Sequence, residues 1–224
     1  QILMGTQSVN ESPNYIVVCD AKLPIEQKMN EDGTFSKPLN NGSVMTKQRI
    51  VHQDDVNRAR YMPQKTSIIA TKSTANVSIY NRNLHGEVPI KNAGSSPQLI
   101  LTGHTEEGYG LSWHPTTAGR LVSGSNDKKI LIWDILSNHK LSKHLDETPS
   151  NDPPSVEPLL TLLGHTEIVE DVTFHPTKES MVISCSDDKT VCVWDTRQNE
   201  HPIFKVTGHS REVNSLSINS FNDN

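Results

Sequence analysis

Residues 184–195 read Ser184-Cys-Ser-Asp-Asp188-Lys-Thr-Val-Cys-Val-Trp194-Asp195, and residues 123–134 repeat the pattern as Ser123-Gly-Ser-Asn-Asp127-Lys-Lys-Ile-Leu-Ile-Trp133-Asp134. In both stretches an aspartate stands in a polar turn, six residues before the tryptophan. Small and β-branched residues on either side of such a turn are typical of a β-hairpin. The repetition indicates that the chain is built from copies of one structural unit.

A second block, which opens with a histidine, recurs through the chain. Nine residues after each of these histidines stands Tyr, Trp, Phe or Ile, and a glycine precedes three of the four. The histidines are 52, 61 and 44 residues apart along the chain. They are His52, His104, His165 and His209.

A unit of about 40–45 residues with four short strands, running from Gly-His to Trp-Asp, is the repeat of the WD40 β-propeller. We therefore predict an all-β fold, a single propeller domain that is incomplete, with about four of an expected seven blades. Because a ring of this kind needs all its blades to close, we expect the chain to be part of a longer protein. The predicted divisions are a three-strand partial blade at 1–51, a degenerate blade at 52–103, full blades at 104–164 and 165–208, and the first strand of a further blade at 209–224.

Three regions depart from the regular pattern. The degenerate blade replaces the repeat serine, turn aspartate and tryptophan with Ala70, Thr74 and Tyr80. Residues 28–43 are rich in turn-forming residues and indicate a long loop. Residues 137–158 hold four prolines among polar residues, so we expect a mobile polar excursion there. Residues 213–218 are expected to form the strand of the final partial blade.

The repeated Ser, His and Asp could be taken for a hydrolase triad. A triad that occurs twice, with a decayed third copy, is unusual for an enzyme, and buried polar side chains are commonly joined in structural networks. We therefore interpret these residues as two structural tetrads and predict no catalytic residue. A zinc site is also disfavoured, because the repeat histidines fall in different blades. The tetrads are His104, Ser123, Asp127 and Trp133, and His165, Ser184, Asp188 and Trp194.

The charge of this 224-residue chain is concentrated at one position of the repeat. The five residues after each repeat histidine carry formal charges of −2, −2, −2 and 0, against −5 for the whole chain. In a propeller these residues enter the innermost strands, so we expect their carboxylates to converge at the mouth of the central channel and attract Lys or Arg. An acidic chain without a long apolar run argues against bulk nucleic-acid binding and against a membrane span.

Several strings give the chain a more specific resemblance. Val56-Asn-Arg-Ala-Arg-Tyr-Met-Pro-Gln64 and Glu107-Gly-Tyr-Gly-Leu-Ser-Trp113 are the most distinctive, and 68–72, 169–172, 194–197 and 212–217 support them. With these strings the sequence resembles the retinoblastoma-associated histone-binding WD40 proteins, the small-subunit family of chromatin assembly factor. The resemblance covers nearly the whole chain apart from residues 28–43 and 137–158, where the second segment is longer than in the family.

The resemblance implies a non-enzymatic, nuclear subunit of chromatin assembly or modifying complexes, with histones and other complex subunits as partners and no cofactor. It also implies a site for basic histone-tail peptides on the acidic face of the propeller, in which Asp55 stands where the family often has Glu. The alternative is a generic WD40 adaptor, such as a ubiquitin-ligase substrate receptor, although such receptors usually have basic mouths. The positions that match the peptide site are Asp55, Asn57, Glu107, Tyr109, Glu170 and Asn214.

Overall fold

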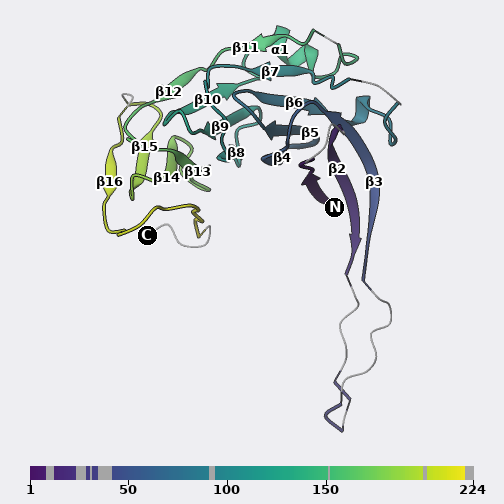
Figure 1. The fold of residues 1–224 in the computed structure, drawn as a ribbon, viewed down its shortest axis with the longest axis horizontal. Coiled ribbons are helices and arrows are strands. Elements are labelled where there is room, and N and C mark those ends of the chain that lie inside the picture. Colours follow the sequence, from purple (N-terminus) through teal and green to yellow (C-terminus); the bar gives the residue numbers. More distant parts are fainter. Residues whose placement is uncertain are drawn as a thin grey trace.

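The structure, a computed structural model, is an arc of four antiparallel β-sheets placed side by side (Figure 1). It describes residues 1–8, 13–23, 29–30, 32–34, 42–90, 94–150, 152–198 and 201–219, so most of the expected loop at 28–43 lies outside the described residues. The predicted all-β partial propeller is confirmed. In the described part of the chain, no helix combines the length and the hydrophobicity that a membrane span requires.

Each sheet runs from an inner strand to an outer strand, and the inner strands of neighbouring sheets contact one another. The first sheet contains β1 (Ile2–Gly5), β2 (Asn14–Lys22) and β3 (Ser43–His52). The second contains β4 (Arg58–Met62), β5 (Lys65–Lys72), β6 (Val77–Asn81), β7 (Leu99–Leu101) and β11 (Ser155–Val156), with the 3-10 helix η1 (Arg82–Leu84) after β6. The third contains β8 (Leu111–Trp113), β9 (Arg120–Gly124), β10 (Ile130–Asp134) and β12 (Leu160–Leu162), and the fourth β13 (Val169–Phe174), β14 (Met181–Ser186), β15 (Val191–Asp195) and β16 (Phe204–Val206).

The core consists of thin apolar layers between neighbouring sheets. Along β10, Leu131 and Trp133 pack toward the second sheet, whereas Ile130 and Ile132 pack toward the fourth. Successive side chains of a strand point to opposite faces, so a strand with both faces covered must be apolar throughout. Burying each Leu or Ile contributes about 1.5–3 kcal/mol. Because most of these strands are short, such layers form although only 33% of the residues in the chain are hydrophobic.

The excursion at 137–158 is packed against the arc, contrary to the prediction of a mobile polar loop. It contains α1 (His139–His144), which begins where the Asn138 side chain accepts a hydrogen bond from the Lys140 N–H. After α1, Leu145 is 1% exposed in the apolar layer between the second and third sheets. The segment then adds β11 in parallel to the outer strand β7. The prolines mark the ends of these elements, but the burial of Leu145 anchors the segment.

The described residues 213–218 form no strand, so the strand expected there is not found in this structure. A strand requires a ladder of hydrogen bonds with a neighbour. Here the segment makes isolated bonds instead: the Val213 N–H donates to the Ser186 carbonyl at 3.2 Å, and the Leu216 N–H donates to the Asp171 carboxylate at 3.4 Å. The segment therefore lies along the fourth sheet without belonging to it.

Candidate functional site

Four side chains of the fourth sheet form a continuous buried hydrogen-bond chain. The Trp194 indole N–H donates to the Ser184 hydroxyl at 2.8 Å, and that hydroxyl lies 2.7 Å from Nε2 of His165. On the other side of the ring, Nδ1 of His165 lies 2.9 Å from the Asp188 carboxylate. Each donor in this chain meets one acceptor when the proton of the histidine is on Nδ1. The network joins β14 and β15 to the loop that enters β13, which is a structural role.

Protonation in this chain is fixed by its surroundings. Burial lowers the pKa of His165, and its contact with Asp188 opposes that shift without reversing it. Burial acts to raise the pKa of Asp188, but hydrogen bonds from Thr190 and His165 outweigh it, so the pKa of this carboxyl falls well below its usual range. The pair is therefore a neutral imidazole beside a carboxylate at neutral pH.

The corresponding chain in the third sheet is incomplete. His104 lies 3.0 Å from the Asp127 carboxylate, as expected. Burial acts to raise the pKa of Asp127, but His104 together with the Thr105 and Lys129 N–H groups outweighs it, so this pKa falls to about 2. The Ser123 hydroxyl, however, donates only to the Gly124 carbonyl at 3.5 Å, and the Trp133 indole donates to the Thr102 carbonyl at 3.2 Å. Nε2 of His104 is buried without a hydrogen-bond partner among the described residues. The expected tetrad is thus reduced to its His–Asp pair.

The degenerate blade keeps part of the network in a shifted register. Nε2 of His52 lies 2.9 Å from the Thr71 hydroxyl, so Thr71 and not Ala70 takes the place of the repeat serine. The Tyr80 ring packs 5.8 Å from the His52 ring, between ring centroids. Thr71 follows His52 by the 19 residues that separate His165 from Ser184, whereas alignment on the aromatic residue points one residue too early.

The acidic loops that enter the second and third sheets meet in one pocket, the mouth pocket, which has a volume of about 700 Å³. Four of the six positions expected to bind a peptide line it: Asp55, Asn57, Glu107 and Tyr109. None of its described lining residues is Lys or Arg. The other lining residues are Gln7, Pro13, Asn14, Gln53, Asp54, Ser73 and Thr74.

Close contacts of the backbone of this loop hold Glu107 and Tyr109 in place. A Cβ on Gly108 would lie 2.6 Å from the Gly124 carbonyl oxygen, so only glycine lets the loop approach β9 this closely. The Ser125 hydroxyl lies 2.7 Å from the Glu107 carbonyl, and the Asn126 N–H donates to the same carbonyl at 2.8 Å. The loop is therefore fixed while the Glu107 side chain remains exposed.

Asp55 and Asn57 are held from the neighbouring sheet and from their own. The Asn14 side chain donates to the Asp55 carboxylate at 2.8 Å. The Asn57 amide donates to the Ser73 carbonyl at 3.1 Å and to the Glu107 carboxylate at 3.4 Å. These bonds orient the polar groups toward one another and leave the remaining oxygens of the two carboxylates available to a ligand.

Glu170 and Asn214 do not line the mouth pocket. Glu170 is the second residue of β13, the inner strand of the fourth sheet, where burial and the neighbouring carboxylate of Asp187 raise its pKa. Asn214 is exposed on the segment that follows β16. Glu167, in the loop directly before β13, is 3.4 Å from Lys128, so its charge is partly balanced. The repeat register therefore predicts one position per blade, and the structure brings only two neighbouring blades together around one space.

Lys72 is a buried cation below this mouth that sequence reasoning missed. It is 0% exposed and donates to the Ala75 carbonyl at 3.1 Å. Burial lowers its pKa to about 8, while Asp127 and Glu107 favour its charged form. The sequence signal was a lysine at the end of a strand, directly after Ile68-Ile-Ala-Thr71.

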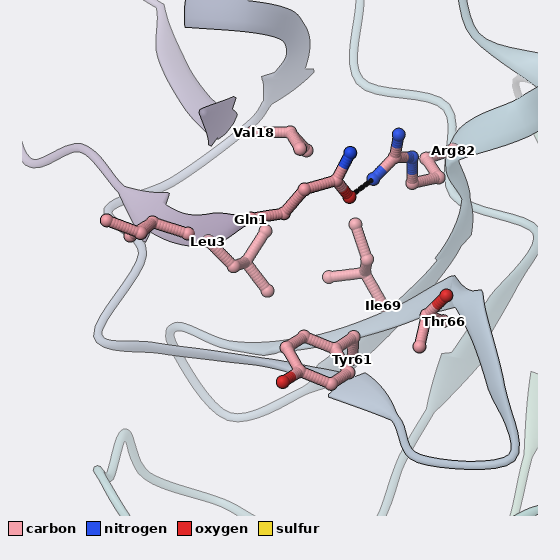
Figure 2. A pocket seen from close by; sticks show the side chains of 8 residues that line it. Gln1, Leu3, Val18, Tyr61, Thr66, Ile69 and Arg82 are labelled. Carbon is pink, nitrogen blue, oxygen red and sulfur yellow. Dashed lines mark hydrogen bonds between the residues drawn. The ribbon is translucent and has the colours of Figure 1, made fainter. Parts of the chain in front are cut away.

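A smaller pocket of about 260 Å³ lies at the opposite end of β4, between the first and second sheets (Figure 2). Leu3, Val18 and Ile69 line it together with the exposed Tyr61. Its one charged lining residue, Arg82, donates to the Gln1 side chain at 2.9 Å. This mixed, partly satisfied lining defines no ligand chemistry, which leaves the mouth pocket as the candidate site.

Comparison with protein families identifies two repeats of a known class in the chain. Residues 95–134 and 156–195 match the family model described as WD domain, G-beta repeat. Each match ends at the Trp-Asp pair of its hairpin, Trp133-Asp134 in the first and Trp194-Asp195 in the second. The chain thus contains WD40 repeats, and repeats of this class support a scaffold for protein interactions.

Proposed function

We propose that the chain is part of a non-enzymatic histone-binding scaffold subunit of nuclear chromatin assembly or modifying complexes, and that the mouth pocket receives a basic tail peptide. The observation that carries this proposal is the composition of the pocket. Asp54, Asp55 and Glu107 line it, and no Lys or Arg is among its described lining residues. Carboxylates that lack basic neighbours attract a cationic side chain from a partner.

The geometry suggests how a lysine or arginine would be held. Asp55 and Glu107 would accept charge-assisted hydrogen bonds, which are shorter and stronger than neutral ones. Asn57, already between them, would contribute its amide to a backbone or guanidinium group. Tyr109 is 40% exposed at the rim and can pack against the apolar stem of the bound side chain or against a guanidinium plane.

The link to histones rests on the family resemblance together with the pocket. Both distinctive strings reach it: the first through Asn57 and the second through Glu107 and Tyr109. The alternative of a ubiquitin-ligase substrate receptor is less well supported, because an acidic mouth repels the phosphopeptides that such receptors commonly bind.

Fluorescence anisotropy with a labelled histone H3 amino-terminal peptide tests this function. We expect Glu107→Gln to weaken binding about 3- to 30-fold, since one charge-assisted contact is lost. Glu179→Gln is the matched control, because Glu179 is an exposed carboxylate in the turn after β13, at the opposite end of the blades. Binding should also weaken as salt is added.

Two results would contradict the proposal. Equal affinities for the wild type and Glu107→Gln would remove the mouth pocket from peptide binding. No affinity for the basic peptide, in a protein that gives a cooperative melting transition, would remove the histone-binding function itself.

A further inference from the structure

The concave side of the arc holds a second space with the opposite charge. This inner cavity has a volume of about 360 Å³ and lies between the inner strands β4, β8 and β13 and the segment 216–218. Its lining combines Arg58 and Arg60 with Ser112, Thr173 and the aromatic residues Trp113 and Phe174. A cavity with two cations, hydroxyl groups and apolar walls has the composition of a binding site.

The two arginines project from the same face of one strand. Arg58 and Arg60 are two residues apart on β4, so their side chains leave the same face of the strand. The Trp113 indole donates to the Arg60 carbonyl at 3.0 Å and fixes the strand at this point. The sequence thus places two guanidinium groups within about 7 Å along one strand, at the same wall of the cavity.

Neither guanidinium is neutralised by an ion pair in the described part of the chain. Arg60 donates to the adjacent Ala59 carbonyl at 3.0 Å. Burial and the repulsion of Arg58 lower the pKa of Arg60, and Asp171 opposes these effects. Most of the ten or so donor hydrogens of the two groups therefore remain free for a ligand.

The one carboxylate of the cavity is already engaged. Asp171 is 9% exposed, and its oxygens accept from the Val172 N–H at 3.0 Å, the Leu216 N–H at 3.4 Å and the Ser215 hydroxyl at 3.4 Å. Its charge lessens the repulsion between the arginines, but its lone pairs are directed to two backbone N–H groups and the Ser215 hydroxyl. The lining keeps a net positive charge, from two arginines and one aspartate.

From these contacts we propose that Arg58 and Arg60 form an oxyanion site on the inner side of the arc, which receives a phosphate-type dianion carried by a ligand. Two planar guanidinium forks match the oxygens of a phosphate better than two ammonium groups would. The Ser112 and Thr173 hydroxyls, which lie 3.2 Å apart, hydrogen-bond to each other and donate to the Trp113 and Phe174 carbonyls, so the two guanidinium groups supply the donors of this site. The site is separate from the acidic mouth pocket, although Asn57 of that pocket directly precedes Arg58.

The broadening of the ³¹P NMR resonance of inorganic phosphate by the full chain, at constant ionic strength, tests the proposal. We expect the wild type to bind phosphate and the Arg58→Gln/Arg60→Gln variant to bind it at least about tenfold more weakly. Arg49→Gln is the matched control, since it removes the same charge from the exposed outer strand β3 and should bind as the wild type does.

A single variant keeps the test decisive where the double variant unfolds. Arg58 makes no hydrogen bond or ion pair to the described residues, so Arg58→Gln should leave the near-ultraviolet circular dichroism of the tryptophans unchanged and still weaken phosphate binding. Acetate, a monoanion, should compete poorly with phosphate.

Equal broadening by the wild type, both glutamine variants and Arg49→Gln would overturn the proposal, and equal competition by acetate would overturn the assignment to a dianion. The probe is phosphate without any peptide. Loss of basic-peptide binding by Glu107→Gln therefore leaves this result unaffected, and the two proposals can fail independently.

Discussion

Ser184 and Ser123 occupy the same position of neighbouring repeats but carry different hydrogen bonds, which allows a matched test of the buried network. Both side chains are 0% exposed. Ser184 bonds to Trp194 at 2.8 Å and to His165 at 2.7 Å, whereas Ser123 has one long bond of 3.5 Å to a backbone carbonyl. Serine to alanine removes the same atom in both places, so the difference in stability measures the network.

In Ser184→Ala the buried indole N–H and the buried imidazole nitrogen both lose their partner. Each such group costs about 1–3 kcal/mol. We therefore expect the free energy of unfolding to fall by about 2–4 kcal/mol in Ser184→Ala, and by less than about 1 kcal/mol in Ser123→Ala. At about 2–4 °C per kcal/mol, the first variant should melt roughly 5–15 °C lower.

Urea unfolding followed by tryptophan fluorescence, with thermal melting as a second probe, measures both losses. Agreement of the denaturant slopes would show that both variants unfold from equally compact native states. Equal losses of stability in the two variants would refute the reasoning, because the structure gives only one of the two serines a place in a continuous network.

Three further predictions test other parts of the structure. Burial lowers the pKa values of His52, His104 and His165, so as the pH falls the unfolded chain binds protons before the folded chain does. The stability is therefore complete above about pH 6.5 and should fall below it by up to about 1.4 kcal/mol per pH unit for each histidine. In His165→Gln, the urea midpoint should change less between about pH 7.5 and 5.5 than it does in the wild type. Leu145→Ala should cost about 2–4 kcal/mol in urea unfolding, because Leu145 fills the apolar layer between two sheets, while the exposed Lys140→Ala should change stability by less than about 0.5 kcal/mol; similar small losses in both would mean that the excursion is not anchored. Gly108→Ala should weaken basic-peptide binding in the anisotropy assay, because the new Cβ meets the Gly124 backbone and displaces Glu107, and an unchanged affinity would show that the loop is not held there.

The two hairpins with the complete signature were predictable almost to the residue. The turns of the repeated stretches 123–134 and 184–195 are flanked by β9 and β10 and by β14 and β15, as the hairpin pattern predicts. Their period-two apolar pattern and the turn residues between them are local properties, so no knowledge of distant contacts is needed.

Features that depend on distant contacts were predicted less well. Leu145 lies in a polar segment, and its burial depends on apolar side chains of the second and third sheets that are far away in sequence. The strand at 213–218 has a suitable pattern but no neighbouring strand in the described part of the chain. Ser123 has the same sequence context as Ser184, yet the Trp133 indole turns to the Thr102 carbonyl instead.

The candidate site shows the same division between local and distant information. The repeat register identified Asp55 and Glu107 as equivalent positions, and the structure places both at the mouth pocket. The repeat register could not identify Asn14 or Gln7, which enter the pocket from the first sheet and have no counterpart in the repeat pattern. Nor could it separate Glu170 from the pocket, because that depends on how the blades are arranged in the arc.

The central claim is that Glu107 holds a cationic side chain of a basic peptide in the mouth pocket. A charge-swap cycle measures this contact directly: the affinities of wild type and Glu107→Lys are determined for a basic histone-tail peptide and for versions in which one lysine at a time is replaced by glutamate. We predict that Glu107→Lys weakens binding of the native peptide and that one lysine-to-glutamate peptide recovers at least about tenfold of the loss, through a coupling of more than about 1.4 kcal/mol. Additive losses for every peptide would contradict the account.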